Sequence, residues 1–61
     1  MKPKAKVIGQ DGNVFNLLAI CCKALKDNDE HEKQTELRGR VFSAKSYDEA
    51  LRIMGEYCEL I

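Results

Sequence analysis

The stretch from Val14 to Leu25 reads VFNLLAICCKAL and contains only two frankly polar residues, Asn16 and Lys23. These two lie seven positions apart, so on a helix they fall within about 20° of each other on one face. Apolar side chains cover most of the remaining circumference, which is typical of a helix in the middle of a fold. The run is shorter than the roughly 20 residues that a bilayer requires. We therefore expect a central helix from Val14 to Lys26 or Asp27, with its apolar side chains from Phe15 to Leu25 buried.

The segment before this helix alternates charged and apolar residues. Its lysines, Lys2, Lys4 and Lys6, alternate with Pro3, Ala5 and Val7, a period of two that is typical of a strand with one exposed face. We expect a strand over residues 4–9, with proline tolerated near its start. The turn-forming residues GQDGN at 9–13 then end the strand, and Asn13 is the expected N-cap of the central helix.

The middle of the chain is its most polar part. Asp27-Asn28-Asp29 ends the central helix, because these residues prefer caps and turns. We expect a surface helix from Glu30 to Phe42, held down by Leu37, Val41 and Phe42. Gly39 lowers the helical preference by about 1 kcal/mol relative to alanine. An alternative therefore ends this helix at Arg38, with Gly39 beyond its last turn and residues 40–44 extended.

The last helix has the sharpest local signal. Ser46 followed by Glu49 three residues later forms a capping-box pattern, with acids in the first turn. The apolar residues that follow keep the three-and-four spacing of an amphipathic helix: Tyr47, Ala50, Leu51, Met54 and Cys58. We expect a helix over residues 47–57, with Tyr47 and Met54 in the core and Tyr57 near an interface. Residues 58–61 either continue this helix or form a short strand, in which Glu59 lies opposite a lysine of the first strand.

These elements predict one small α+β domain over residues 1–61: an N-terminal strand, three helices, and a possible short C-terminal strand that pairs with the first. A domain of 61 residues buries only about 60% of its unfolded surface and is marginal alone. Ten basic and ten acidic residues balance to a net charge near zero. This balance favours a protein partner or self-association over nucleic acid. The exposed edge of a two-stranded ribbon is a further candidate interface for a homodimer.

The cysteines predict a reducing compartment and no metal. Cys21, Cys22 and Cys58 are odd in number, and two of them are adjacent in a helical pattern, which is not a disulfide framework. Adjacent residues on a helix point about 100° apart and do not chelate a metal as zinc pairs do. Free cysteine is a common core residue. With no secretory signal pattern at the start, we expect a cytoplasmic protein, bacterial or in an infected host cell, without a cofactor.

Catalytic chemistry is disfavoured by the same residues. His31 lies among charged neighbours on a surface helix, away from cysteines that are expected to be buried. No serine stands in a nucleophile-elbow pattern. The loop of Gln10, Asp11, Gly12 and Asn13 joins a strand to a helix N-terminus, where backbone N–H groups can hold an anion, although it lacks a P-loop lysine. An alternative function uses the lysine row to bind nucleic acid.

The segments KAKVIGQDGNVFNLL and SYDEALRIMGEYCEL together resemble a group of short bacterial and bacteriophage proteins. Members begin with a similar K-x-K-x-x-G-x-D-G-N-x-F segment and finish with a similar S-x-x-Y-D-x-x-L-R-x-x-x-E-Y/W segment. The likeness fades over residues 27–44. The matching positions are Gly9, Asp11, Gly12, Asn13, Phe15, Ser46, Tyr47, Asp48, Leu51, Arg52, Glu56 and Tyr57. The resemblance implies a compact cytosolic protein carried on phages or other mobile elements, and it implies no particular activity.

We therefore expect a non-enzymatic binding protein of phage or mobile-element type, which acts by docking to a protein or by sequestering a small ligand. The alternative is a small nucleic-acid-binding regulator that uses the lysine row. The candidate binding residues are Gln10, Asp11, Gly12 and Asn13 in the loop, with Arg52 and Tyr57 in the last helix. Self-association as a homodimer or larger assembly is expected, and no membrane contact.

Overall fold

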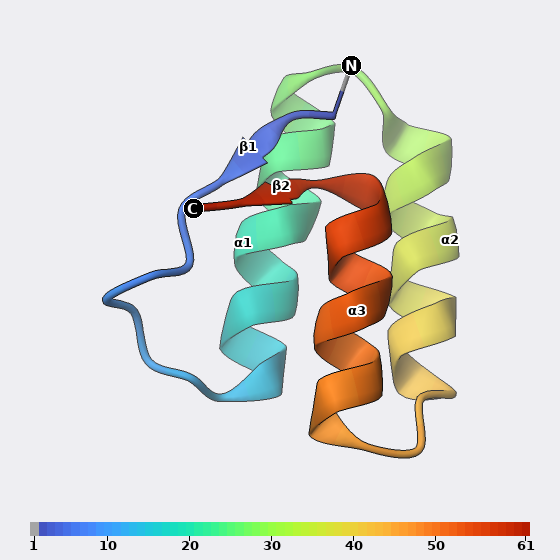
Figure 1. Ribbon diagram of the computed structural model, residues 1–61. Helices are drawn as coiled ribbons and strands as arrows, with labels where there is room; N and C mark the ends of the chain where they lie inside the picture. Colours follow the sequence, from blue (N-terminus) through green and yellow to red (C-terminus); the bar gives the residue numbers. More distant parts are fainter. Residues whose placement is uncertain (1) are drawn as a thin grey trace.

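The protein folds as three helices with a two-stranded ribbon across one end (Figure 1). The computed structural model describes residues 2–61. In chain order the elements are β1 (Lys4–Ala5), α1 (Val14–Asp27), α2 (His31–Phe42), α3 (Tyr47–Tyr57) and β2 (Glu59–Leu60). This is the small α+β architecture that the sequence predicts. The second helix continues through Gly39 to Phe42, so the alternative with an extended segment at 40–44 is wrong.

Local capping residues explain where α1 and α3 begin. The Asn13 side chain accepts a hydrogen bond from the backbone N–H of Phe15, as expected of an N-cap. The Ser46 hydroxyl accepts the backbone N–H of Glu49 at 3.1 Å. The other half of the expected capping box differs, because the Glu49 carboxylate accepts the backbone N–H of Lys45 at 3.3 Å rather than that of Ser46. Both helices therefore start at the residue that the sequence indicates.

The ribbon is parallel and joins the two ends of the chain. Lys4 lies opposite Glu59, and Ala5 lies opposite Leu60. The expected strand over residues 4–9 is too long, since only Lys4–Ala5 is a strand. The reason is the length of its partner: β2 has two residues, and the single carbonyl of Ile61 already accepts the N–H groups of both Val7 and Ile8. Beyond this point the backbone turns at Gly9, whose φ of 86° lies in the left-handed region.

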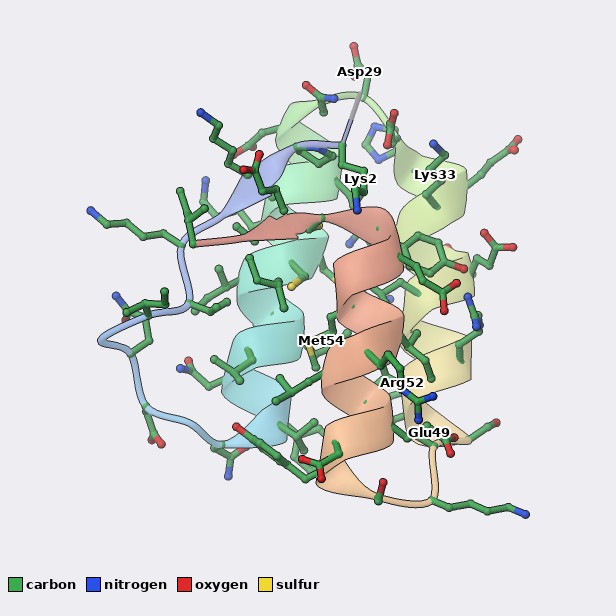
Figure 2. All side chains as sticks on the ribbon, viewed as in Figure 1. Lys2, Asp29, Lys33, Glu49, Arg52 and Met54 are labelled. Atoms are coloured by element: carbon green, nitrogen blue, oxygen red, sulfur yellow. The ribbon has the colours of Figure 1, made fainter. Side chains whose placement is uncertain are left out.

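The core lies between the three helices and under the ribbon. Met54 of α3 points between the helices (Figure 2) and has no exposed surface. The buried apolar side chains come from all three helices, from β1 and from the residue before β2. They are Ala5, Leu17, Leu18, Cys21, Cys22, Leu25, Leu37, Val41, Ala50, Ile53, Met54 and Cys58.

Three aromatic side chains that the sequence assigned to the core are exposed instead. Phe15 is 61% exposed, Phe42 is 62% exposed and Tyr47 is 46% exposed. All three stand at helix ends, on the first turn of α1, the last residue of α2 and the first residue of α3. At these positions no further turn of a neighbouring helix extends past them. Three expectations are therefore wrong: that Phe15 is buried, that Phe42 holds its helix against the core, and that Tyr47 is a core residue.

Candidate functional site

The loop residues singled out from the sequence are held in place by their own polar groups. The Asp11 carboxylate accepts the backbone N–H of Asn13 at 3.1 Å, and the Asn16 amide donates to the Asp11 carbonyl at 2.9 Å. The Tyr47 hydroxyl donates to the Gly12 carbonyl at 2.7 Å. Gln10, Asp11, Gly12 and Asn13 are all exposed. The loop is thus tied to both α1 and α3, and its polar groups serve its own structure.

Arg52 and Tyr57 lie elsewhere. Figure 2 shows Arg52 beside Glu49 on the side of α3 that is turned away from the loop. Arg52 lines a shallow polar pocket of about 190 Å³ together with Arg40, Glu49, Ile53 and Glu56. Tyr57 ends α3, ten residues after Tyr47, which corresponds to about 15 Å along a helix. The six predicted residues therefore form two separate groups rather than one site.

An exposed aromatic groove is the feature that the sequence reasoning missed. It measures about 350 Å³ and is lined by Val14, Phe15, Val41, Phe42, Ala44, Lys45, Ser46, Tyr47 and Ala50. The ends of all three helices meet here, at the end of the bundle away from the ribbon (Figure 1). We call this feature the aromatic groove.

The rim of the aromatic groove is fixed before anything binds. The rings of Phe15 and Phe42 lie 6.1 Å apart between centroids and are tilted by 50°, within the range of favourable aromatic pairs. Tyr47 is anchored through its hydrogen bond to Gly12. A Cβ atom at Gly12 would lie 3.4 Å from the Tyr47 hydroxyl, which is about van der Waals contact. Tyr47 therefore has less conformational freedom to lose on binding than an unanchored side chain would have.

The lining of the aromatic groove is mostly apolar, and both of its side-chain hydroxyl groups are engaged in hydrogen bonds within the chain. Lys45 is the one charged residue among the lining side chains. The Ser46 hydroxyl caps α3, and the Tyr47 hydroxyl holds the loop. The lining contains no histidine, cysteine or carboxylate. Such a surface can bind an apolar group by contact and desolvation.

The cysteines lie in the core near the ribbon, as expected from the sequence. Cys21 and Cys58 are at most 1% exposed, and the Cys58 thiol lies 3.6 Å from the Cys21 carbonyl oxygen. Burial, with the neighbouring Cys58, raises the pKa of Cys21 to about 12. Burial also raises the pKa of Cys58. Both thiols are therefore protonated at neutral pH, where only a thiolate would be a nucleophile or a metal ligand.

The remaining charged candidates are exposed or already paired. The Lys2 amine donates to the Gly55 carbonyl at 2.8 Å, at the last turn of α3, and Lys4 lies in register with Glu59. The His31 ring nitrogen lies 3.8 Å from the Asp29 carboxylate, with 64% of the side chain exposed. Among residues 2–61, no cluster of three or more His, Cys, Asp or Glu side chains is placed to hold a metal ion.

Comparisons with family models, with curated proteins and with solved structures find no match to this chain. Within residues 2–61, none of the helices has the length and apolar character needed to cross a bilayer. The candidate site consequently depends on the geometry of the aromatic groove.

Proposed function

We propose that the protein is a non-enzymatic binding protein that docks to an apolar segment of a partner protein chain through the aromatic groove. The single observation that carries this proposal is the gathering of three exposed aromatic side chains, Phe15, Phe42 and Tyr47, around one apolar groove. Aromatic residues are enriched in the energetic centres of protein interfaces. A contiguous exposed apolar patch on a small monomer is itself a sign of an interaction site.

Docking to a protein is favoured over sequestering a small ligand. Small-ligand pockets occupy about 300–1,000 Å³ and enclose most of the ligand surface, with a few convergent polar groups that fix its orientation. The aromatic groove stands at the small end of this range, with about 350 Å³, and two of its polar groups already bind within the chain. The aromatic groove is therefore an open surface that side chains of a partner can contact, and not an enclosed pocket for a small ligand.

The nucleic-acid alternative gains no specific support. Of the three lysines in the row, Lys2 is bonded to the end of α3 and Lys4 stands beside Glu59. A local acid beside a lysine reduces the attraction for phosphate, and the net charge of the chain is zero. The phage or mobile-element origin and the cytoplasmic location stay predictions from the sequence, and they make bacterial cells the setting for the test.

The test is site-specific photo-crosslinking of the full chain in bacterial cells. One variant carries p-benzoylphenylalanine in place of Phe42, in the aromatic groove. The matched control carries it in place of Glu36, an exposed residue of the same helix. We expect a discrete adduct from position 42 that disappears when Phe15→Asp is added, and no such adduct from position 36.

The adduct partner is then purified and its affinity measured by calorimetry. We expect Phe42→Asp to weaken binding at least about tenfold, as the loss of an interface aromatic does. Equal adducts from positions 36 and 42, no adduct from position 42, or undiminished binding of the Phe42→Asp protein would each overturn the proposed function.

A further inference from the structure

A second apolar patch lies at the end of the ribbon. Ile8 is 75% exposed and Ile61 is 40% exposed. The two are neighbours, because the Ile61 carbonyl accepts the backbone N–H groups of Val7 and Ile8 at 2.7 and 2.8 Å. These bonds hold the backbone of the two residues side by side. We call this pair the isoleucine knob.

The isoleucine knob and the aromatic groove account for all of the large hydrophobic side chains that residues 2–61 expose: Ile8, Phe15, Phe42, Tyr47 and Ile61. The loop of residues 9–13 connects the two patches along one side of the molecule (Figure 1). This loop is pinned to the groove, since Gly12 accepts the Tyr47 hydroxyl. One chain therefore presents an exposed aliphatic pair and an apolar groove with exposed aromatic rings, and the loop of residues 9–13 joins the two.

We propose that the occupant of the aromatic groove is the isoleucine knob of a second copy of this chain, in a closed pair with both contacts made reciprocally. This inference rests on the proposed function and names its partner. In a twofold pair, each copy gives its knob to the groove of the other and receives one in return. All five exposed apolar side chains are then removed from water.

The sizes of the two patches agree. A volume of about 350 Å³ corresponds to roughly a dozen water molecules at about 30 Å³ each. Two isoleucine side chains bring four carbons each, which this space accommodates alongside its rim. Isoleucine side chains carry neither an aromatic ring nor a charged group, so the apolar lining does not exclude them. The knob and the groove therefore match in chemistry as well as in volume.

The area of the interface favours use of both patches at once. At roughly 150–250 Å² for a whole aromatic side chain, the exposed parts of Phe15, Phe42 and Tyr47 offer about 300 Å². A stable interface buries about 800 Å² on each partner. The chain exposes 4185 Å² in total, so such an interface would take about a fifth of it. A groove-to-groove contact is too small by itself, whereas a pair that covers knob, loop and groove approaches the required area.

One pair of charges beside the two patches is complementary. Lys6 lies two residues before the knob, and Asp48 directly follows Tyr47 at the groove; both are exposed. Neither has an ion-pair partner within residues 2–61. The net charge of zero also removes long-range repulsion between copies. A reciprocal pair brings an unpaired lysine toward an unpaired aspartate twice.

The test measures the oligomeric state of the purified full chain by sedimentation velocity and native mass spectrometry up to about 1 mM chain. We expect a dimer whose dissociation constant rises by about a hundredfold in Ile8→Asp and in Phe42→Asp, because each change is present twice in the pair. Glu36→Ser is the matched surface control and leaves the dimer unchanged. Circular dichroism verifies that each variant is folded, with Ile8→Ala and Phe42→Ala as replacements if an aspartate variant is not.

Mixing the two aspartate variants separates knob-in-groove contacts from any other pairing. Ile8→Asp keeps its groove and Phe42→Asp keeps its knob, so we expect a mixed dimer with one intact contact, which neither variant forms with itself. A monomeric wild-type chain, an Ile8→Asp protein that dimerises like the wild type, or the lack of a mixed dimer would overturn the inference. If the wild type is monomeric while position 42 still crosslinks to a different protein, the inference fails and the proposed function stands.

Discussion

The two ends of α1 carry similarly apolar side chains and meet different surroundings. At the ribbon end, which we call the closed end, Cys21 and Leu25 have no exposed surface. At the groove end, which we call the open end, Phe15 is 61% exposed. The ribbon lies beside the closed end (Figure 1), and Cys58, just before β2, contacts Cys21 there. The difference teaches that an apolar side chain is buried only where a neighbouring element extends far enough to cover it.

The strongest test of this comparison removes one large side chain from each end. Leu25→Ala leaves a cavity at the closed end and should lower the free energy of unfolding by about 2–5 kcal/mol. Since a core of this size supplies about 3–5 kcal/mol in total, this variant should keep little stability and show a fraction of unfolded chain before urea is added. Phe42→Ala at the open end should change the free energy of unfolding by about 0.5 kcal/mol or less. Urea denaturation at low protein concentration measures both, and equal losses at the two ends would contradict the comparison.

The closed end should also make the fold sensitive to alkali. Burial beside Cys58 raises the pKa of Cys21 from 9.0 to about 12 in the folded protein. Above pH 9 the unfolded chain loses this proton while the folded chain keeps it, so the unfolded state binds fewer protons and stability falls as pH rises. The stability is intact below about pH 9 and declines between pH 9 and about 12.

Thermal melting across this pH range measures the alkaline decline. Cys21→Ala is the control, because it lacks the buried thiol but keeps every lysine and tyrosine that also titrates in alkali. We expect the melting temperature of the wild type to fall more steeply with pH than that of Cys21→Ala. Parallel slopes for the two proteins would show that the Cys21 thiol is not shielded at the closed end.

The sequence predicts the parts of this fold that depend on neighbouring residues in the chain. Asn13 and Ser46 place the starts of α1 and α3, because a capping side chain bonds to a backbone N–H only two or three residues away. The length of β1 is not predictable in this way. It is limited by the two residues of β2, which arrive from the other end of the chain.

The aromatic groove is harder to predict than the core. Phe15 has the same three-and-four spacing as Leu18, Cys22 and Leu25, so periodicity assigns it to the buried face. Whether a neighbour covers it depends on where α2 ends. Phe42 did carry a usable signal, since Leu37 and Val41 lie four residues apart on one face of α2 and Phe42 lies about 100° around the helix from Val41. The distance of Arg52 and Tyr57 from the loop likewise depends on tertiary structure, because the orientation of α3 sets it.

The loop at the open end should loosen when its tyrosine anchor is removed. Tyr47→Phe loses the hydrogen bond of 2.7 Å to the Gly12 carbonyl. An ordinary hydrogen bond contributes about 0.5–1.5 kcal/mol, and the exposed position should place this one at the low end. Melting temperature and amide exchange over residues 13–16 measure the change. Tyr57→Phe is the matched control, because its hydroxyl accepts only a contact of 3.3 Å from Arg40; a larger effect at Tyr57 would refute the anchoring role.

The smallest effect is expected between the two ends, where α2 and α3 are joined on the surface. The Arg40 guanidinium donates to both carboxylate oxygens of Glu56, at 2.7 and 3.3 Å, and lies 5.7 Å from the centroid of the Tyr57 ring. The hydrogen bonds from Arg40 lower the pKa of Glu56. The stabilisation from this pair is therefore present above the ordinary pKa of a glutamate and is lost as pH falls through the lowered value.

Glu56→Gln should lower the melting temperature only slightly at neutral pH, because both side chains are exposed and the pair is screened by water and salt. The difference from the wild type should shrink in concentrated salt and in acid, where the wild-type carboxylate is itself neutralised. Glu36→Gln on the polar face of α2, an exposed glutamate without an ion pair within residues 2–61, is the matched control and should show no such dependence. A difference that persists in acid and salt would mean that Glu56 acts by packing rather than by charge. The comparison of the closed and open ends assumes that surface ion pairs contribute little and that side-chain burial accounts for the difference. Such a result would contradict the first part of that assumption.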